Sequence, residues 1–349
     1  MAFVGNPVLT YWARSTSLNY ARAGHETVLL ANGKVMVGGG RSDSYTIAQI
    51  CEFYTPSTGW QVGAVMNSPR FYYTLTPFAK NTKVLAVGGI DPASQSTAEI
   101  YDGGGGTWTQ ISANLSNGRF AHGAALLNNE QILIMGGINN SGYVLFSTEL
   151  FNPSSNSFMK AKHMNIGRVL FTTTLLNDGS TVLVTGGGDP FGLMEPTAEI
   201  YKFGSWMFVM DLMTQPRAYH SAVLLQDGTV LIAGGGNGAS ASYSTAEIYN
   251  PTTDTFTPVG SMNYPRALFT LTLLPSGKVL ATGGIDWTTN TYPAICELYD
   301  PITQKWSKTQ ILNNGRNFHR SLLLNDSVLT IGGYIMPKNQ SNTCEKYKF

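Results

Sequence analysis

Charged residues are scarce in this sequence. Its 22 Lys and Arg and 21 Asp and Glu make up 12% of 349 residues, where about 25% is usual for a soluble globular domain. The formal net charge is +1 and no basic cluster occurs, which argues against a nucleic-acid-binding surface. No apolar run approaches the roughly 18 residues of a membrane-spanning helix, and the first residues lack the pattern of a signal peptide. We therefore expect no nucleic-acid or membrane partner, and both an extracellular and a cytoplasmic location stay open.

Cysteine is scarce as well. Cys51, Cys296 and Cys344 are odd in number and show no CxxC spacing, so the sequence indicates neither a disulfide framework nor a zinc site. A P-loop, a nucleophile elbow and an HExxH motif are also absent. These absences favour a non-catalytic protein without a cofactor, although they leave the question of enzymatic activity open.

Glycine, by contrast, is abundant, with 38 residues, and a Gly-Gly doublet follows a short apolar run seven times. The doublets begin at Gly38, Gly88, Gly136, Gly186, Gly234, Gly283 and Gly332. Successive spacings lie between 48 and 50 residues, and seven periods of 49 account for 343 of the 349 residues. The repeat therefore predicts a single domain that covers residues 1–349.

The fifth unit shows which secondary structure the repeat encodes. Residues 222–225 (AVLL) and 230–235 (VLIAGG) flank a Gln-Asp-Gly turn and predict a tight β-hairpin, because Asp-Gly suits a turn with positive φ. Residues 246–249 (AEIY) predict a third strand, and a fourth strand after the next turn carries Phe256. Each unit is thus predicted to contain four short strands, A to D, and no helical period is found.

These motifs resemble the kelch repeat, in which a Gly-Gly doublet is followed by Glu-x-Tyr and then by a Trp about six residues past the next turn. The matching aromatic residues are Trp60, Trp108, Phe158, Trp206, Phe256 and Trp306. The resemblance covers the whole chain. It implies an all-β, seven-bladed β-propeller of kelch type, with four antiparallel strands in each blade around a central channel.

The two ends of the chain predict how the ring closes. The seventh unit stops after its third strand, so its fourth strand must come from elsewhere. Trp12 stands ten residues before Arg22, as Trp306 stands ten residues before Arg316. We therefore expect residues 6–16 to form the outer strand of blade 7, which leaves no unpaired sheet edge at the seam.

Every unit carries one Arg in the D–A loop and one Glu in strand C. The arginines are Arg22, Arg70, Arg119, Arg168, Arg217, Arg266 and Arg316. The glutamates are Glu52, Glu99, Glu149, Glu199, Glu247, Glu297 and Glu345. Seven cations and seven anions could form a catalytic or anion-binding array. Since function rarely needs seven equivalent copies, we interpret them as a structural charge pair in each blade.

A residue with a planar aromatic side chain occurs three positions after each of these arginines. These residues are His25, Tyr73, His122, Phe171, His220, Phe269 and His319. Strand A is the innermost strand, so we expect this position to surround one mouth of the channel. His25, His220 and His319 are the candidate metal ligands, but other aromatic residues replace histidine here. We therefore prefer a packing role and predict no metal.

One segment is also similar to the copper-binding region of the galactose-oxidase family, whose enzymes are kelch propellers. It reads Arg217-Ala218-Tyr219-His220-Ser221, and the resemblance implies that an adjacent Tyr and His donate copper ligands. The radical site of that family further requires a Tyr cross-linked to a Cys on a strand-A position. All three cysteines here stand just before the strand-C Glu instead. We therefore do not expect an oxidase.

The B–C loops differ in sequence from unit to unit, whereas the sequences of the A–B and C–D turns are similar in the different units. The D–A and B–C loops should lie at the same end of each blade, so we expect a ligand on that face. Aromatic and acidic side chains suit a peptide or a sugar. The candidates are Tyr45, Tyr143, Phe191, Tyr243, Trp287, Tyr292, Asp189 and Asp286.

The sequence thus predicts a monomeric, non-catalytic recognition scaffold that binds a protein or peptide on the D–A/B–C loop face. The alternative is a propeller that binds or modifies a carbohydrate, with a metal at the channel mouth and a glycan as its ligand. Blade 4 also has an unusually apolar outer strand at residues 206–210. That strand either exposes a partner site or packs against blade 5, and we favour packing.

Overall fold

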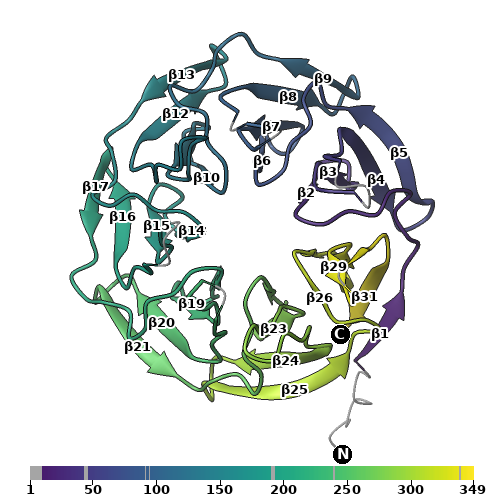
Figure 1. The fold of residues 1–349 in the computed structure, drawn as a ribbon, viewed down its shortest axis with the longest axis vertical. Coiled ribbons are helices and arrows are strands. Elements are labelled where there is room, and N and C mark those ends of the chain that lie inside the picture. The colour runs from purple at the N-terminus through teal and green to yellow at the C-terminus, as the bar shows by residue number, and fades with distance from the viewer. Residues whose placement is uncertain are drawn as a thin grey trace, which may run out of the picture.

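A computed structural model describes residues 10–42, 46–90, 92–93, 95–189, 193–238, 240–337 and 339–349. In these ranges the chain forms seven four-stranded antiparallel sheets, arranged as a ring around a central channel (Figure 1). They contain no helix long and apolar enough to cross a membrane. The predicted all-β, seven-bladed propeller is confirmed.

Each blade runs from strand A at the channel to strand D at the outer rim. From blade 1 to blade 7 the strands are β2 (Glu26–Leu29), β3 (Val35–Gly38), β4 (Ile50–Thr55) and β5 (Gly59–Val65); β6 (Thr74–Phe78), β7 (Lys83–Val87), β8 (Ala98–Asp102) and β9 (Thr107–Gln110); β10 (Gly123–Leu126), β11 (Ile132–Met135), β12 (Thr148–Asn152) and β13 (Ser157–Lys160); β14 (Thr172–Leu175), β15 (Val182–Thr185), β16 (Ala198–Lys202) and β17 (Ser205–Phe208); β18 (Ser221–Leu224), β19 (Val230–Ala233), β20 (Ala246–Asn250) and β21 (Thr255–Val259); β22 (Thr270–Leu273), β23 (Val279–Thr282), β24 (Ile295–Asp300) and β25 (Lys305–Ile311); and β27 (Arg320–Leu323), β28 (Ser327–Ile331), β31 (Cys344–Lys348) and β1 (Tyr11–Arg14).

The N-terminal strand closes the ring, as predicted. β1 pairs antiparallel with β31, with Trp12 opposite Tyr347. Each of the seven blades has the same kind of aromatic pair between strands C and D, with ring centroids 5.1–5.5 Å apart. Residues 6–9 of the expected segment lie outside the described residues. That residues 1–349 form one domain remains a proposal.

The hydrophobic core is divided among the joints between neighbouring blades. Seven clusters of buried side chains occur, and each combines residues of two adjacent blades. The three cysteines belong to these clusters, where burial raises the pKa of Cys51, Cys296 and Cys344 to about 12. They are therefore protonated packing residues at physiological pH.

The glycine doublets explain how neighbouring blades are joined. In all seven joints the N–H of the second Gly donates to the carbonyl oxygen of the next blade's repeated Arg, at 2.7–3.0 Å. The first Gly is left-handed, and a Cβ on Gly88 would lie only 2.6 Å from the carbonyl oxygen of Arg119. Another side chain would push the blades apart, so glycine recurs at this position.

In blade 1 the structural doublet is Gly39 and Gly40, one residue later than the sequence analysis placed it. Their φ angles of +64° and +86° match the +64° and +100° of Gly88 and Gly89 in blade 2. Because Gly38, Gly39 and Gly40 are consecutive, the sequence alone does not show which two of them form the doublet. The spacing from the first joint to the second is therefore 49 rather than 50 residues.

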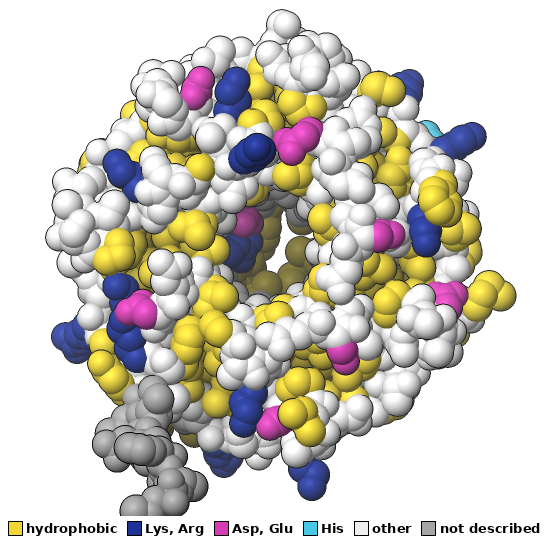
Figure 2. Space-filling model, turned by 180° about the vertical axis from the view of Figure 1, so that it is seen from behind, with side chains coloured by type: hydrophobic (Ala, Val, Ile, Leu, Met, Phe, Trp, Pro, Cys, Tyr) yellow, Lys and Arg dark blue, Asp and Glu magenta, His cyan; other side chains and the backbone are white. Residues whose placement is uncertain are grey.

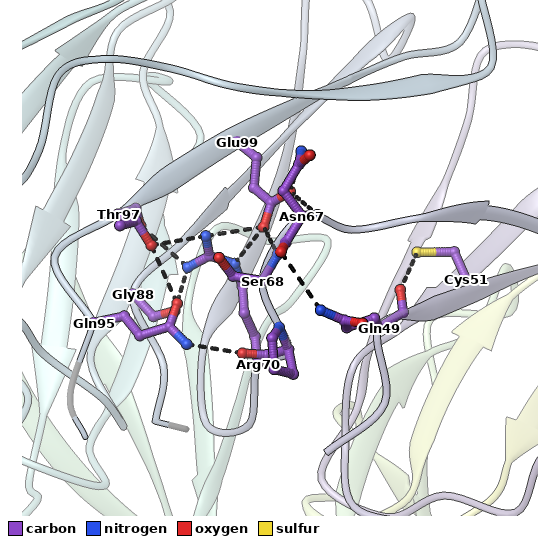
Figure 3. A network of polar contacts seen from close by, with 10 residues as sticks. Gln49, Cys51, Asn67, Ser68, Arg70, Gly88, Gln95, Thr97 and Glu99 are labelled. Atoms are coloured by element: carbon purple, nitrogen blue, oxygen red, sulfur yellow. Dashed lines mark hydrogen bonds and ion pairs between the residues drawn. The ribbon is translucent and has the colours of Figure 1, made fainter. Parts of the chain in front are cut away.

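The repeated Arg and Glu form a buried network, drawn for blade 2 in Figure 3. The Arg70 guanidinium donates to the Glu99 carboxylate (3.0 Å) and to the carbonyl oxygens of Gly88 and Thr97 (2.7 and 3.1 Å). Glu99 also accepts hydrogen bonds from the backbone and side-chain amides of Asn67. All seven arginines are fully buried, and each contacts the Glu of its own blade at 2.6–3.1 Å. The pair ties the D–A loop to the glycine doublet and the B–C loop.

Candidate functional site

The D–A and B–C loops of each blade lie side by side at one end of the sheet. In blade 3, Phe120 of the D–A loop bridges to Ile138, which in turn bridges to Val144 of the B–C loop. Comparable bridges occur in blades 1, 2, 4, 5 and 6. In blade 7 they extend to a small sheet of β26 (Arg316–Asn317), β29 (Tyr334–Ile335) and β30 (Asn339–Gln340). These loops together build one face of the propeller, the loop face.

Seven residues, one from each D–A loop, line the channel at the loop face and form what we call the collar. They stand two positions after the repeated Arg and share a left-handed backbone, with φ between 50° and 63°. Five backbone hydrogen bonds of 2.8–3.3 Å join consecutive members. The collar consists of Gly24, Tyr72, Ala121, Leu170, Tyr219, Leu268 and Phe318.

The sequence analysis did not identify the collar. A signal was present, because blade 1 has Gly24 at this position and glycine favours a left-handed backbone. The position also varies from glycine to tyrosine, although it lies between a constant Arg and a residue that always carries an aromatic ring. Such variation inside a regular array is what a binding residue would show.

A pocket of about 270 Å³ opens beside the collar on the loop face, and we call it the mouth pocket. Its walls are largely apolar and come from blades 2 to 5. Among the residues that line it are Tyr72, Phe120, Ile138, Asp189, Met194 and Tyr219. A concave apolar surface with a few polar groups is the usual form of a ligand site.

Aromatic rings surround Tyr72 at this mouth. Its ring centroid lies 4.0 Å from that of Phe71, 5.8 Å from that of Phe318 and 6.4 Å from that of Phe120. Phe318 belongs to blade 7 and Tyr72 to blade 2. Their rings can meet because the collar residue of blade 1, between them, is Gly24, which has no side chain. The result is a cluster of aromatic rings from blades 2, 3 and 7 at the mouth.

The two collar tyrosines are electrically neutral at physiological pH. Burial raises the pKa of both Tyr72 and Tyr219, and the nearby Tyr219 and Tyr334 phenols raise that of Tyr72 further. The positive charges of Arg41 and Arg320 oppose this effect on Tyr72 but do not outweigh it. The tyrosines therefore offer a ring face and a hydroxyl that donates or accepts a hydrogen bond.

The channel next to the collar has a different character. It holds a cavity of about 380 Å³, to which the inner strands of several blades contribute. Glu26 and Arg320, on the inner strands of blades 1 and 7, form an ion pair in its wall, and Thr74 and Thr76 add hydroxyl groups. Seen from behind, the central opening contains a basic and an acidic side chain (Figure 2). The site thus combines an apolar mouth with a polar interior.

Of the predicted ligand residues, the structure brings two to the mouth. Asp189 lines the mouth pocket directly. Trp287 contacts it through Tyr219, because the two rings meet edge to face with centroids 5.1 Å apart. Tyr45 and Phe191 lie outside the described residues.

The other predicted ligand residues lie away from the mouth pocket. Tyr143 is 71% exposed at a loop tip, and Tyr243 is half-buried in its own loop. Tyr292 is hydrogen-bonded to Asn317 of the next blade. Asp286 is buried and accepts hydrogen bonds within its own loop. The prediction for these four residues is therefore not supported by proximity to the pocket.

The histidines differ from the expectation that they surround the mouth. They are at most 8% exposed and lie in the joints between blades. For example, His220 Nε2 lies 3.1 Å and 2.9 Å from the hydroxyls of Thr172 and Thr185 in the preceding blade. The residue before each histidine points to the channel, so the histidine itself turns into the joint. Burial lowers the pKa of His25, His122, His220 and His319, that of His122 to about 3.

The candidate metal ligands lie apart from one another, because each histidine points into a different joint between blades. His25, His220 and His319 belong to three different joints. Within the ranges that the structure describes, no group of three or more His, Cys, Asp or Glu side chains is placed to hold a metal ion. That the protein binds no metal remains a prediction.

The fold is a seven-bladed β-propeller with a central channel. Comparison with known proteins identifies the repeat, because the kelch motif matches residues 216–263, the fifth blade. This match and the kelch-like relatives support the resemblance to kelch-repeat proteins that the sequence motifs implied.

Its relatives share only part of their length with this chain. Kelch-like protein 15 of Danio rerio is 28% identical over 163 residues, which cover 40% of this chain and 26% of the relative. The same protein of Homo sapiens is 26% identical over an equal length. Spermatocyte protein spe-26 of Caenorhabditis elegans is 24% identical over 184 residues, or 51% of this chain and 31% of the relative. The chain thus spans about a quarter to a third of these relatives.

A solved structure shares the fold over almost the whole chain. It is described as a novel fungal alcohol oxidase with catalytic diversity among the AA5 family, in complex with copper. The two structures align with a TM-score of 0.74 over 98% of this chain and 76% of the oxidase, at 18% sequence identity. At this identity the likeness shows a common fold and nothing about activity.

Proposed function

We propose that this propeller is a recognition scaffold that binds a protein or peptide at the mouth pocket on the loop face. The observation that carries the proposal is the pocket itself, an apolar hollow of about 270 Å³ between Tyr72 and Tyr219. Around it stand loops that differ from blade to blade on an otherwise regular ring. The kelch repeat and the kelch-like relatives also favour a protein-interaction scaffold.

The chemistry of the pocket suits an apolar side chain of a peptide. Tyrosine rings bury a large contact area at a small cost in conformational entropy, since each has only two side-chain torsions. Their hydroxyls stay protonated and can pair with the backbone amides of a ligand. Asp189 adds a negative charge to the lining, and Trp287 supports Tyr219 from behind. Burial of such an aromatic pair at the centre of an interface commonly dominates affinity.

Alanine substitutions in the collar test this proposal. Dodecapeptides would first be selected from a random library on the wild-type protein and then titrated by isothermal calorimetry. Tyr72→Ala and Tyr219→Ala should each weaken binding by about tenfold or more, because each removes one wall of the pocket. The left-handed backbone tolerates alanine, since Ala121 occupies the same position in blade 3 with φ at 50°.

Leu268→Ala is the matched control. Leu268 belongs to the collar and lines the channel cavity, but it is not part of the mouth pocket lining. Its substitution should change the affinity by less than about twofold. If all three variants bind like wild type, or lose affinity equally, the mouth pocket is not the binding site.

Carbohydrate binding at the same mouth is the second candidate function. The observation that favours it is the combination of tyrosine rings at the mouth with the Glu26–Arg320 pair and threonine hydroxyls in the channel. Sugars are commonly held by such ring faces and polar groups. A glycan array together with metal analysis of the purified protein separates the candidates. A specific glycan signal that Tyr219→Ala abolishes, or stoichiometric copper or iron, would favour the second.

A further inference from the structure

The outer part of blade 4 carries a dense group of exposed apolar side chains, which we call the rim patch. Its members and their exposed fractions are Phe203 (91%), Met207 (48%), Phe208 (42%), Met210 (87%) and Leu212 (52%). The described residues include 16 large exposed hydrophobic side chains, and five of them fall within these ten positions. Such a concentration on the surface of a soluble protein is typical of an interaction site.

The sequence analysis favoured packing of this strand against blade 5, and the structure shows that only part of it packs. Trp206 and Val209 are buried, with Trp206 against Tyr201 at a centroid distance of 5.3 Å. Met207 and Phe208, between them, remain exposed. Packing therefore accounts for two residues of the segment and leaves the side chains of Met207 and Phe208 largely open to solvent.

The strand that carries the patch is also a sheet edge. The order in blade 4 is β14-β15-β16-β17, and β17 lies on the outer rim of the ring (Figure 1). In the part of the chain that the structure describes, no strand pairs with its outer side. An edge strand presents free backbone donors and acceptors, to which an extended segment can add.

Blade 3 shows what a protected edge looks like at the same positions. Met159 pairs with Leu150 as Met207 pairs with Ile200, and the two methionines are equally exposed, at 49% and 48%. The next residue is Lys160 in blade 3 but Phe208 in blade 4. A lysine is a common guard against strand addition, and blade 4 lacks it.

A groove next to the rim patch indicates the charge of the occupant. It has a volume of about 440 Å³ and lies between the outer strands of blade 4 and the turns of blade 5. Met207 and Phe208 form an apolar wall. Asp178, Asp227 and Asp254 contribute three carboxylates to its lining, against one ammonium group, that of Lys202. The charged side chains that line the groove therefore sum to −2, which favours a cationic partner.

We propose that the rim patch and its groove bind an extended segment of a partner protein that bears both apolar and basic side chains. The segment adds alongside β17 and covers Met207 and Phe208 with its apolar side chains. Its basic side chains face the aspartates of the groove. This surface lies on the outer rim, and its groove shares no lining residue with the mouth pocket.

A pair of model peptides tests the proposal. The probe is a fluorescein-labelled nonapeptide of alternating lysine and valine, and its counterpart has glutamate in place of lysine. In fluorescence anisotropy titrations of the full chain, the lysine peptide should bind about tenfold or more tightly than the glutamate peptide. Its affinity should fall as the salt concentration rises, because the charges of the groove are screened.

The matched variants Met207→Lys and Met159→Lys locate the site. Both place a lysine on an equally exposed position of an outer strand, so they change the net charge of the protein identically. Met207→Lys should weaken binding of the lysine peptide by about tenfold or more, whereas Met159→Lys should change it by less than about twofold. An unchanged melting temperature checks the fold of both variants.

Three results would overturn the proposal: binding of neither peptide, equal binding of both, or equal weakening by the two variants. Sedimentation equilibrium of the wild type provides a further check. If the protein forms a dimer that Met207→Lys dissociates and Met159→Lys does not, the occupant of the rim patch is a second copy of this chain. That result would also contradict the proposed partner segment.

Discussion

Replacing Glu247 by glutamine should lower the free energy of unfolding by about 3–5 kcal/mol. Glu247 accepts a hydrogen bond from Arg217 Nη2 at 2.9 Å and further bonds from the backbone and hydroxyl of Thr214, and both charged side chains are fully buried. Glutamine removes the counter-charge and leaves the Arg217 guanidinium uncompensated in the interior. Urea titration followed by tryptophan fluorescence measures the loss.

An exposed ion pair provides the control for this substitution. Lys278 contacts Asp300 at 3.2 Å, but its side chain is 46% exposed and solvent screens the pair. Lys278→Ala should therefore leave the denaturation midpoint unchanged. If Glu247→Gln is equally harmless, the repeated Arg and Glu do not hold the blades together, and their sevenfold recurrence needs another explanation.

Acid should destabilise the protein through its buried histidines. The folded-state pKa of His122 is lowered to about 3 by burial, with smaller contributions from Arg119 and Arg70, whereas an unfolded histidine titrates near 6.5. Below pH 6.5 the unfolded chain binds a proton that the folded chain does not. The stabilisation is thus fully present above pH 6.5 and is lost as the pH falls toward 3. At pH 5 the loss should be about 2 kcal/mol for His122.

The chain itself suggests the variant that tests this acid effect. Blades 4 and 6 have Phe171 and Phe269 at the position of His122, so phenylalanine fits the joint. His122→Phe should reduce the difference in unfolding free energy between pH 7.5 and pH 5 by about 2 kcal/mol. His163→Phe is the control, because His163 lies exposed on the surface and outside the joints. An unaltered pH dependence in His122→Phe would contradict the account of the joints.

The fold could be predicted from the sequence because the repeated residues all serve the joints. The Gly-Gly doublet bonds to the next blade, the Arg and Glu tie the loops together, and the strand-C and strand-D aromatics stack. Each task needs a particular residue type in every blade, so the period is visible in the sequence. Where a run of three glycines blurred the pattern, the predicted register of blade 1 was one residue too early at Gly38.

The candidate site was harder to predict, because the local backbone conformation decides which side chains face the channel. The left-handed residue two positions after each Arg points its side chain at the channel, and this turns the following residue into the joint. The pattern of residue types does not reveal which of these neighbours faces the channel. The expectation therefore fell on the histidines, whereas Tyr72 and Tyr219 line the mouth.

Several of the predicted loop residues lie away from the mouth pocket for a related reason. Asp286 and Tyr292 look available in the sequence, but Asp286 bonds within its own loop and Tyr292 reaches the next blade. Such partners lie up to 25 positions away and cannot be read from a variable loop. Asp189 lines the mouth pocket, and Trp287 contacts the collar residue Tyr219.

The central claim is that a protein or peptide ligand enters the mouth pocket on the loop face. The most direct test is a crystal structure of the protein with a dodecapeptide selected for binding to it. The account predicts electron density for an apolar side chain of the peptide between Tyr72 and Tyr219. A peptide bound at the opposite face of the ring, with the mouth pocket empty, would contradict it.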